Sequence, residues 1–273
     1  MSFLLFRLYG PLASWGEIAV GESRHTAVYP GKSALLGLLA AALGIRREEE
    51  EKQKALAEGY QFAVKVLSTG HLLQDYHTAQ VPDSTGKINY STRRDELVLG
   101  KLRLGTILSS REYRCDALSL VAVRPLETAP YSLEELCNAL REPKFYLYLG
   151  RKSCPLAAPL NPRIIAGKGF GNVLNNYQFG ILYLDDRLKK EVKTDLKDRE
   201  GNKPWIETTN KVSGFSHDDK RWLPLEKTVR YYWEGDAGDL KPKQVLTRHD
   251  QPLSRVRWQF VRRSENLYME EAS

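Results

Sequence analysis

Cysteine is scarce in this chain. The three cysteines, Cys115, Cys137 and Cys154, lie far apart and form no C-x-x-C motif paired with histidines. An odd number of scattered cysteines predicts neither a disulfide framework nor a structural zinc site. We therefore expect the reducing cytoplasm as the compartment, and no metal or other cofactor.

Long apolar runs are missing as well. The apolar start of the chain is interrupted by Arg7, and it is too short for a signal peptide or a membrane span. No later segment has the roughly 18 uninterrupted apolar residues that indicate a spanning helix. The sequence predicts a soluble protein that does not enter a membrane.

Acidic residues are outnumbered by basic ones. Lys and Arg total 41 against 34 for Asp and Glu, which gives a formal charge of +7 and a pI of about 9.2. This balance favours a polyanion or an anionic surface as partner, although modest positive charge is also common in proteins that bind neither. At 273 residues the chain is long enough for two domains with separate cores. We predict them at residues 1–158 and 159–273.

A complete nucleotide-triphosphate loop is also absent. Gly31, Lys32 and Ser33 precede an apolar helix, for which Ser33 is the predicted N-cap and Gly44 the residue past the end. A P-loop needs a glycine five residues before Gly31, where Thr26 stands. A helix start beside a lysine still attracts a single phosphate. The alternative is a helix cap with a surface lysine.

The predicted elements follow the order strand, helix, strand, strand, helix, strand. The strands are expected at residues 2–9, 60–67, 112–124 and 144–149. The second helix starts at Ser132, which forms a capping box with Glu135. This βαββαβ order predicts an α+β, ferredoxin-like fold, and in the RRM such a sheet is a common platform for single-stranded RNA.

Residues 78–111 interrupt this order with turn-forming residues and little apolar content. From Ser84 to Arg114 there are seven cations and three acids, a local balance of +4. The insertion is predicted to be a projecting basic β-hairpin, or to be disordered in the free protein, and the two are compatible. Its inner cations are Lys87, Arg93, Arg94, Lys101 and Arg103.

Cations also gather in the second half of the chain. Gly150 permits close backbone approach and is followed by Arg151 and Lys152. This arrangement suits recognition of an anionic ligand backbone. The alternative is a solvated turn with two surface cations. Residues 241–263 hold seven cations and one acid, and residues 256–261 alternate as in a strand. A further strand is expected at 179–184 and a charged surface segment at 185–202.

Six sequence blocks, in order, resemble one known family. They read RLYGP at residues 7–11, YPGKSALLGLL at 29–39, QFAV at 61–64, DYHT at 75–78, REYRCDA at 111–117 and YLGRKSCPL at 148–156. The family is the fifth Cas protein family, in the branch formed by the CasD subunits of type I-E CRISPR Cascade complexes. The blocks lie within residues 3–160, and the resemblance weakens beyond them.

The resemblance implies a ferredoxin-like RAMP domain with a protruding hairpin, the thumb, and a smaller β-rich C-terminal domain. It implies a non-catalytic RNA-binding subunit that grips the 5′ handle of the CRISPR RNA in antiviral defence. The partners would be the large subunit and the backbone subunits of Cascade, and target DNA would be reached only through the complex. The thumb would coincide with the basic insertion and separate handle from guide.

The expected RNA contacts are the cations and aromatic side chains in and near these blocks. Bases would stack on or hydrogen-bond to Tyr76, His77 and Tyr113. Stacking of one base on an aromatic side chain contributes about 1–3 kcal/mol to binding. His25 belongs to the same predicted set. Phosphates would meet Arg24, Lys32 with Ser33, Arg111, Arg114, Arg151 and Lys152.

Two other functions stay open from the residues. A metal-independent endoribonuclease, as relatives in type I-C systems are, needs a general base and a cation or acid at the leaving oxygen. His25, Tyr29, Lys32 and His77 are the right residue types, although in type I-E systems a separate subunit cuts the precursor. A stand-alone RRM-like regulator of messenger RNA would instead fold and bind without partners.

Overall fold

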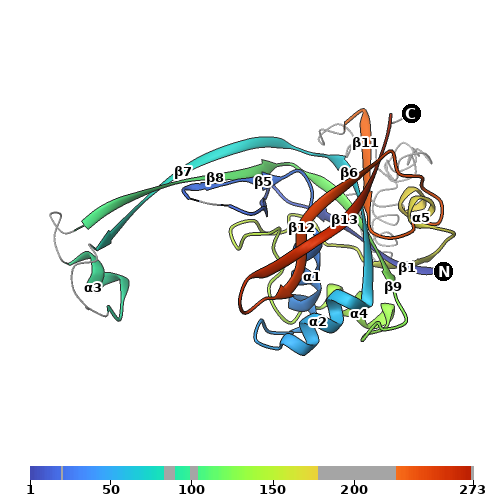
Figure 1. Ribbon diagram of the computed structural model, residues 1–273, viewed down its shortest axis with the longest axis horizontal. Helices are drawn as coiled ribbons and strands as arrows, with labels where there is room; N and C mark the ends of the chain where they lie inside the picture. Colours follow the sequence, from blue (N-terminus) through green and yellow to red (C-terminus); the bar gives the residue numbers. More distant parts are fainter. Residues whose placement is uncertain (20, 83–89, 99–103, 178–225, 272–273) are drawn as a thin grey trace, which may run out of the picture.

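The computed structural model describes residues 1–19, 21–82, 90–98, 104–177 and 226–271. They form a mixed α/β structure with antiparallel sheets (Figure 1). The predicted strand at 179–184 and charged segment at 185–202 lie outside the described residues. In the part of the chain that is described, no helix is long and apolar enough to cross a membrane.

A seven-stranded sheet forms the centre of the molecule, and every neighbouring pair in it is antiparallel. Strands from both sides of the predicted boundary at residue 158 lie in this one sheet, and the boundary itself stays a prediction. In spatial order the strands are β10 (Arg163–Ala166), β1 (Ser2–Tyr9), β9 (Leu118–Pro125), β6 (Tyr60–Ser68), β11 (Thr228–Trp233), β13 (Gln259–Glu271) and β12 (Gln244–Ser254).

Both faces of the sheet are covered, because its central strands are apolar on both sides. In β1, Leu4 and Phe6 belong to one buried cluster, whereas Phe3 and Leu5 belong to another. Alternation along a strand sends these pairs to opposite faces. The first cluster lies under the helices α1 (Lys32–Leu43), α2 (Glu50–Gly59) and α4 (Leu133–Arg141), and the second under α5 (Phe170–Asn176).

Strand β6 is covered on both faces, although its alternating sequence is typical of a strand with one exposed face. Ala63 is only 1% exposed and packs in the second cluster. Lys65 is half-buried, and its Nζ donates to Oδ1 of Asn175 at 2.6 Å. Burial lowers the pKa of Lys65 to about 8. The α5 segment, which lies far away in sequence, covers this face.

The helix termini agree with the sequence in two places and differ in one. The Ser132–Glu135 capping box is confirmed, with the backbone N of Glu135 3.2 Å from Oγ of Ser132. Gly44 is confirmed as the left-handed terminator of α1, with φ 77°. Ser33 is not the N-cap, because helix α1 already starts at Lys32. Its N-cap is Gly31, which has no side chain to form a capping hydrogen bond.

The prediction of a fourth strand at residues 144–149 is wrong. This segment forms only an isolated bridge between Tyr148 and Pro155. Its first two backbone N–H groups donate to the carbonyls at the end of α1, Lys144 to Ala42 and Phe145 to Ala41. The chain therefore caps a helix there, and β10 takes the sheet position beside β1.

Two other strand predictions are wrong because each spans a reversal of the chain. The strand predicted at 112–124 is divided at Asp116, whose φ is 57°, into the end of β8 (Leu104–Cys115) and the start of β9. The strand predicted at 256–261 contains the turn between β12 and β13, where Trp258 has a φ of 53°. Apolar and polar residues alternate through both reversals, so periodicity alone hides them.

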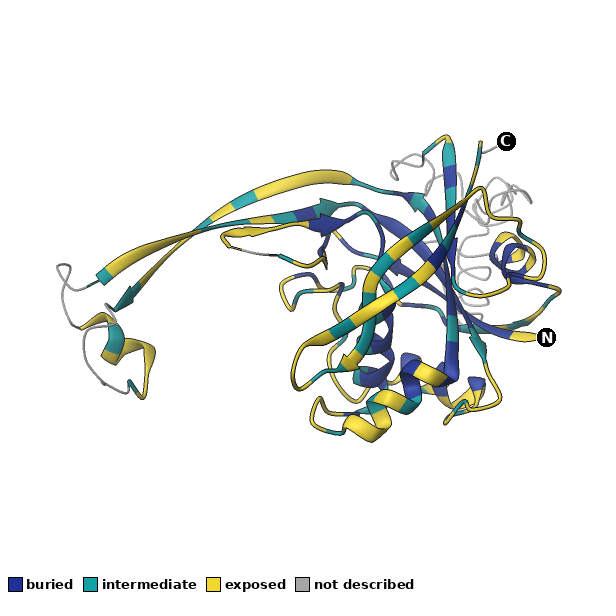
Figure 2. Cartoon of the chain, in the orientation of Figure 1, coloured by how far each residue is buried: buried dark blue, intermediate teal, exposed yellow. Residues whose placement is uncertain are grey.

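A long two-stranded antiparallel ribbon projects from the body of the molecule (Figure 1). It consists of β7 (His71–Pro82) and β8, paired from His71 with Cys115 to Pro82 with Leu104. Most of its residues are exposed (Figure 2). The short helix α3 (Arg93–Leu97) stands at its far end and carries Arg93 and Arg94, both exposed. Lys87, Lys101 and Arg103 lie outside the described residues.

Four very short strands complete the structure near the base of the ribbon. β2 (Leu12–Ala13) pairs antiparallel with β8, and β4 (Ser23–Arg24) pairs parallel with it. β3 (Trp15–Gly16) and β5 (Thr26–Ala27) pair with each other. The loop that follows β1 is therefore held against the base of the ribbon.

Charged side chains join the β12–β13 hairpin and the end of β11 to the start of α1. Lys32 Nζ lies 2.9 Å from Glu234, and Arg263 lies 2.6 Å from both Asp250 and Glu265. The backbone N of Lys32 donates to Asp250 at 2.6 Å. We call this group the charge layer. Its three cations and three carboxylates are Lys32, Arg248 and Arg263 with Glu234, Asp250 and Glu265.

The charge layer is largely shielded from solvent. Although burial opposes the charge on Arg263, its hydrogen bond to Asp250 and the charge of Glu265 raise the pKa of this guanidinium. Tyr29 donates its hydroxyl hydrogen to Glu265 and stacks on Tyr232, with ring centroids 3.7 Å apart. Each ionic group therefore has partners, as buried charges require.

We expect Glu234→Gln to lower the free energy of unfolding by about 3 kcal/mol, because it leaves the buried Lys32 ammonium without its counter-charge. Urea unfolding followed by tryptophan fluorescence measures this. The matched control is Glu96→Gln, which removes the partner of Arg93 from an exposed pair and should change stability by less than about 1 kcal/mol. Equal effects of the two variants would contradict the prediction.

Candidate nucleic-acid interface

Three of the predicted cations meet at the base of the ribbon. Arg24 and Arg111 are register partners in neighbouring strands, β4 and β8. Arg151 reaches them from its own loop: its Nη2 lies 3.5 Å from the carbonyl oxygen of Arg24. We call Arg24, Arg111 and Arg151 the arginine cluster. The next residue, Lys152, is exposed beside it.

Tyr113 does not offer its ring to a ligand in this structure. Its side chain is 7% exposed, and the Arg151 guanidinium carbon lies 5.0 Å from its ring centroid. The arginine therefore occupies the place that a stacked base would take. Tyr113 supports Arg151 from below rather than forming a stacking platform.

The ribbon distributes the other predicted residues over its two faces. Tyr76 is 72% exposed, and alternation along β7 sends the neighbouring His77 to the opposite face. Nε2 of His77 lies 2.6 Å from Oδ2 of Asp75. Tyr76 and His77 therefore cannot contact the same base from one side.

Arg114 and His25 lie on the face of β8 opposite to Arg111. Alternation places Arg114 with Glu112 there, and Nδ1 of His25 lies 3.0 Å from Oε1 of Glu112. This hydrogen bond lowers the pKa of the Glu112 carboxyl. Its carboxylate also accepts from the backbone N of Thr26 and so holds the β4–β5 segment on the ribbon.

Lys32 and Ser33 lie at a helix start that already has carboxylate partners. Lys32 is 7% exposed and paired with Glu234. The carboxylate of Asp250 occupies the helix start, where a phosphate would bind, and would repel an anion. Sequence reasoning assigned Lys32 to the surface because its two acidic partners lie about 200 residues away.

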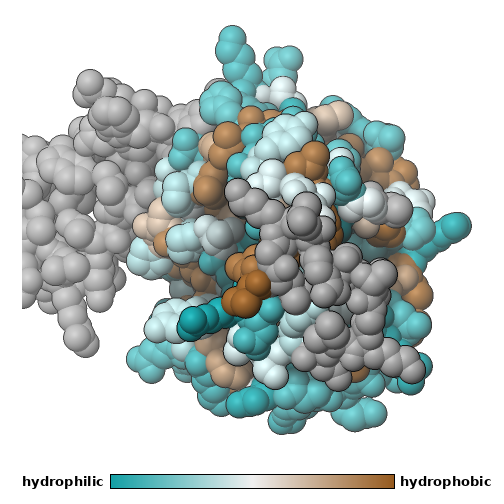
Figure 3. Space-filling model, turned by 90° about the vertical axis from the view of Figure 1, so that its left-hand side faces the viewer, coloured by the Kyte–Doolittle hydropathy of each residue, from teal (hydrophilic) through white to brown (hydrophobic). Residues whose placement is uncertain are grey.

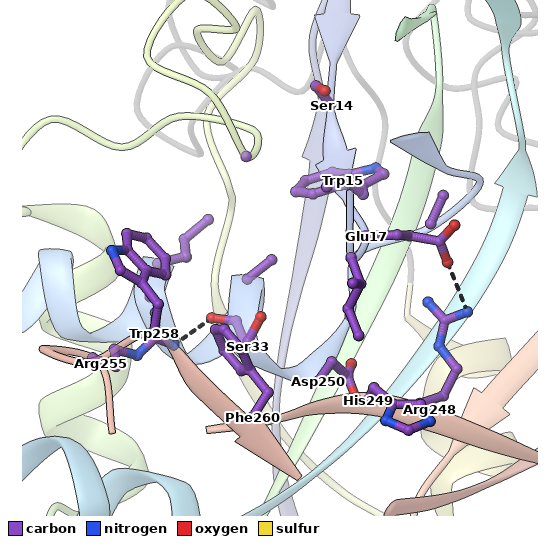
Figure 4. A pocket seen from close by; sticks show the side chains of 18 of the residues that line it. Ser14, Trp15, Glu17, Ser33, Arg248, His249, Asp250, Arg255, Trp258 and Phe260 are labelled. Atoms are coloured by element: carbon purple, nitrogen blue, oxygen red, sulfur yellow. Dashed lines mark hydrogen bonds and ion pairs between the residues drawn. The ribbon is translucent and has the colours of Figure 1, made fainter. Parts of the chain in front are cut away.

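A cavity of about 640 Å³ lies beside the arginine cluster (Figure 4). Its walls are the segment from Ser14 to Ile18, the small-residue face of α1, the loop from Tyr146 to Gly150, and the β12–β13 hairpin. We call it the aromatic groove. Its aromatic lining consists of Trp15, Tyr146, Tyr148, Trp258 and Phe260.

Arg255 gives the groove an unusual charge. Its Nη2 donates to the carbonyl oxygen of Ser33, and within the described residues it forms no ion pair with a carboxylate. Burial, and then the nearby charge of Arg47, lower the pKa of this guanidinium. A shielded cation that lacks a counter-charge favours the binding of an anion.

Trp258 stands beside Arg255 at the tip of the hairpin (Figure 4). It is 64% exposed, and the guanidinium carbon of Arg47 lies 4.1 Å from its ring centroid. Arg47 also donates to the carbonyl oxygens of Arg255 and Val256, which fixes the tip against the segment between α1 and α2. An exposed indole beside an uncompensated guanidinium suits a nucleotide, which has an aromatic base and a phosphate.

Gly150 joins the aromatic groove to the arginine cluster. It lines the groove and is followed directly by Arg151. Its φ is 85°, and a Cβ there would lie 1.9 Å from the carbonyl oxygen of Ser14. Only glycine fits this close approach. The backbone that comes close to Gly150 is therefore that of Ser14 in the same chain.

Sequence reasoning missed Arg255, Trp258 and Tyr148 as members of the site. A signal was present, because Trp258 lies between Arg255, Arg257 and other cations, and basic residues interleaved with aromatics are typical of nucleic-acid binding. Treating residues 256–261 as a strand hid the turn that carries Trp258. Large apolar side chains elsewhere on the surface are interspersed with hydrophilic ones on the face that Figure 3 shows.

Two solved structures described as CRISPR or Cas proteins share this fold. One, described as "CRISPR RNA-guided surveillance complex", has a TM-score of 0.58 and 23% identity, covering 99% of this chain and 90% of that one. Another, "Crystal structure of Cas protein", has a TM-score of 0.51 and 24% identity, covering 99% and 94%. The fold is therefore that of this class of protein.

The family follows from the sequence as a whole. The family model described as "CRISPR-associated protein (Cas_Cas5)" matches residues 3–264, so the chain belongs to that family. It is also 38% identical over 169 residues to the "CRISPR system Cascade subunit CasD" of Escherichia coli (strain K12), across 58% of this chain and 69% of that protein. The resemblance inferred from the six sequence blocks is confirmed.

We expect Gly150→Ala to lower the free energy of unfolding by about 2 kcal/mol, because the new methyl group would clash with Ser14 in a left-handed backbone conformation. Thermal unfolding measures the change. Gly16→Ala is the control in the same groove, since nothing lies within 4 Å of its Cβ position. A Gly150→Ala protein as stable as the control would show that the loop moves freely away from Ser14.

Proposed function

We propose that this chain is a non-catalytic RNA-binding subunit of a type I-E Cascade complex and holds the 5′ handle of the CRISPR RNA. The observation that carries the proposal is the aromatic groove with its uncompensated Arg255, joined through Gly150 to the arginine cluster. The similarity to the E. coli Cascade subunit supports membership of the complex.

The finer architecture is part of the same proposal. The order β10-β1-β9-β6, with α1 and α4 in the two crossovers, supports a ferredoxin-like RAMP domain. Its fourth strand would be β10, which lies just past the predicted boundary at residue 158. The β7–β8 ribbon is proposed to be the thumb. The expected β-rich C-terminal part, residues 159–273, would then supply β10 to the first domain and keep β11, β12 and β13 for itself. The ribbon begins at His71, seven residues before the expected insertion, because pairing continues down to Cys115.

The RNA is proposed to cross from the groove to the ribbon. One or two bases would stack in the groove against Trp258 and Tyr148, with a phosphate on Arg255. The following phosphates would meet the arginine cluster and Lys152. The exposed Tyr76, with Arg93 and Arg94 further along the ribbon, would meet the strand where it leaves.

Several stacked bases and phosphate contacts suffice for tight binding. Each stacked base contributes about 1–3 kcal/mol, and phosphate contacts make the affinity fall with salt. The other sides of the molecule would meet the large subunit and the backbone subunits, and target DNA would be reached through them. We place the complex in the cytoplasm, away from membranes.

The alternative function, a metal-independent endoribonuclease, has weaker support. Its four candidate groups do not converge: His25 and His77 lie on opposite faces of the ribbon, and Lys32 is buried in the charge layer. Burial, and then the charge of Glu265, raise the pKa of the Tyr29 hydroxyl far above its ordinary value. The two histidines would therefore not act together from one face of the ribbon, and Lys32 is already paired with Glu234.

We expect Trp258→Ala to weaken binding of the full-length protein to the 5′ handle about tenfold, because the indole on which a base stacks is removed. Fluorescence anisotropy with a labelled single-stranded RNA handle measures the affinity. The conservative variant Trp258→Phe should retain most of it. Because Trp258 is 64% exposed, both variants should unfold at nearly the same temperature as the parent protein.

The double variant Arg151→Ala with Lys152→Ala examines the phosphate contacts in the same titration. Its affinity should fall, and the salt slope of log K should flatten by about 0.7 for each phosphate that these two cations no longer neutralise. Unchanged binding at every salt concentration would exclude the arginine cluster. Unchanged binding by Trp258→Ala would exclude the groove.

We expect no cleavage of a CRISPR repeat hairpin by the purified chain in EDTA. Denaturing gel electrophoresis after overnight incubation is the readout. A discrete product that disappears in His25→Ala or His77→Ala would establish the endoribonuclease instead. A product unaffected by both variants would indicate a contaminating nuclease.

A further inference from the structure

An ion pair crosses the aromatic groove. Nη1 of Arg248, from strand β12, lies 3.1 Å from Oε1 of Glu17, from the segment after β3, and both residues line the groove (Figure 4). The two partners are 231 residues apart in sequence. The contact therefore exists only because the hairpin and the N-terminal loop face each other across the groove.

Glu17 is a surplus carboxylate at this place. The three cations of the charge layer are matched by its three carboxylates without Glu17. Arg248 lies 3.8 Å from Glu265 in the layer, and its guanidinium carbon lies 5.2 Å from the Tyr29 ring centroid. Arg248 would therefore stay in position if Glu17 left.

The two partners differ in how firmly they are held. The Glu17 side chain is 45% exposed, whereas that of Arg248 is 21% exposed. In the described part of the chain, Arg248 is the only ion-pair partner of Glu17. An ion pair with one exposed partner contributes little to stability. A phosphate, which accepts two hydrogen bonds from a guanidinium, can replace the carboxylate.

We propose that Glu17 is a built-in competitor for RNA phosphate on Arg248. It neutralises Arg248 while the groove is empty and is displaced when a phosphate of the bound strand arrives. Anions that bind weakly then do not displace Glu17 from Arg248. An RNA strand that also stacks its bases in the groove does displace it. This inference rests on the proposed RNA-binding function and adds a residue that sets the affinity and selectivity of the same site.

The test is Glu17→Gln in the full-length protein, titrated with the same labelled RNA handle. We expect binding about two- to fivefold tighter at low salt, the factor that corresponds to loss of one exposed pair. The salt slope of log K should become steeper by about 0.7, because the phosphate takes the position beside Arg248 that the Glu17 carboxylate occupies in the parent protein. Weaker or unchanged binding would overturn the proposal.

Glu22→Gln is the matched control, because it removes the same charge from an exposed position in the same loop. If it tightens binding as much as Glu17→Gln, the effect is one of net charge and the inference fails. A second comparison uses Arg248→Lys, which keeps the positive charge of the layer. In that background the gain from Glu17→Gln should shrink, because a lysine cannot bind phosphate with the two-pronged geometry of arginine.

Trp258→Ala separates this inference from the proposed function. If Trp258→Ala weakens binding but Glu17→Gln changes nothing, the groove holds RNA and Glu17 is not a competitor. If neither variant changes binding, the groove is not the RNA site and the proposed function fails with it.

Discussion

The structure depends on a layer of matched charges between the β12–β13 hairpin and the start of helix α1. Lys32, Arg248 and Arg263 are held by Glu234, Asp250 and Glu265. Removing one member of such a buried set leaves an uncompensated charge. The layer therefore holds the start of α1 and the β12–β13 hairpin together. The hairpin is thereby held over α1, and the aromatic groove is the space that this placement leaves.

The charge layer also places a carboxylate at the motif that suggests phosphate binding. The helix start at Gly31 and Lys32 has the free N–H groups and positive dipole that attract an anion. The protein supplies that anion itself in Asp250. The positive potential that a ligand would meet therefore comes from Arg255 and from the arginine cluster. No carboxylate among the described residues forms an ion pair with Arg255.

Recognition of a single strand would thus be divided between two kinds of surface. The groove offers aromatic rings and one shielded cation, which favour a base with its phosphate. The arginine cluster offers exposed cations on a ribbon, which favour the backbone that follows. Gly150 connects the two because its lack of a side chain lets the loop pass against Ser14. The cations at the base of the ribbon are the part of this site that the sequence had indicated.

Sequence alone determined strands β1 and β6, the capping box at Ser132, the end of α1 at Gly44 and the family, because these depend on local pattern and on residues close in sequence. Only the tertiary structure decided where residues 144–149, 256–261 and Lys32 belong. Their environment is set by partners that lie far along the chain: α1 for the first, Arg47 for the second, and Glu234 and Asp250 for Lys32. Periodicity cannot reveal an interaction between residues about 200 positions apart, since its free energy arises only when the two segments are packed together.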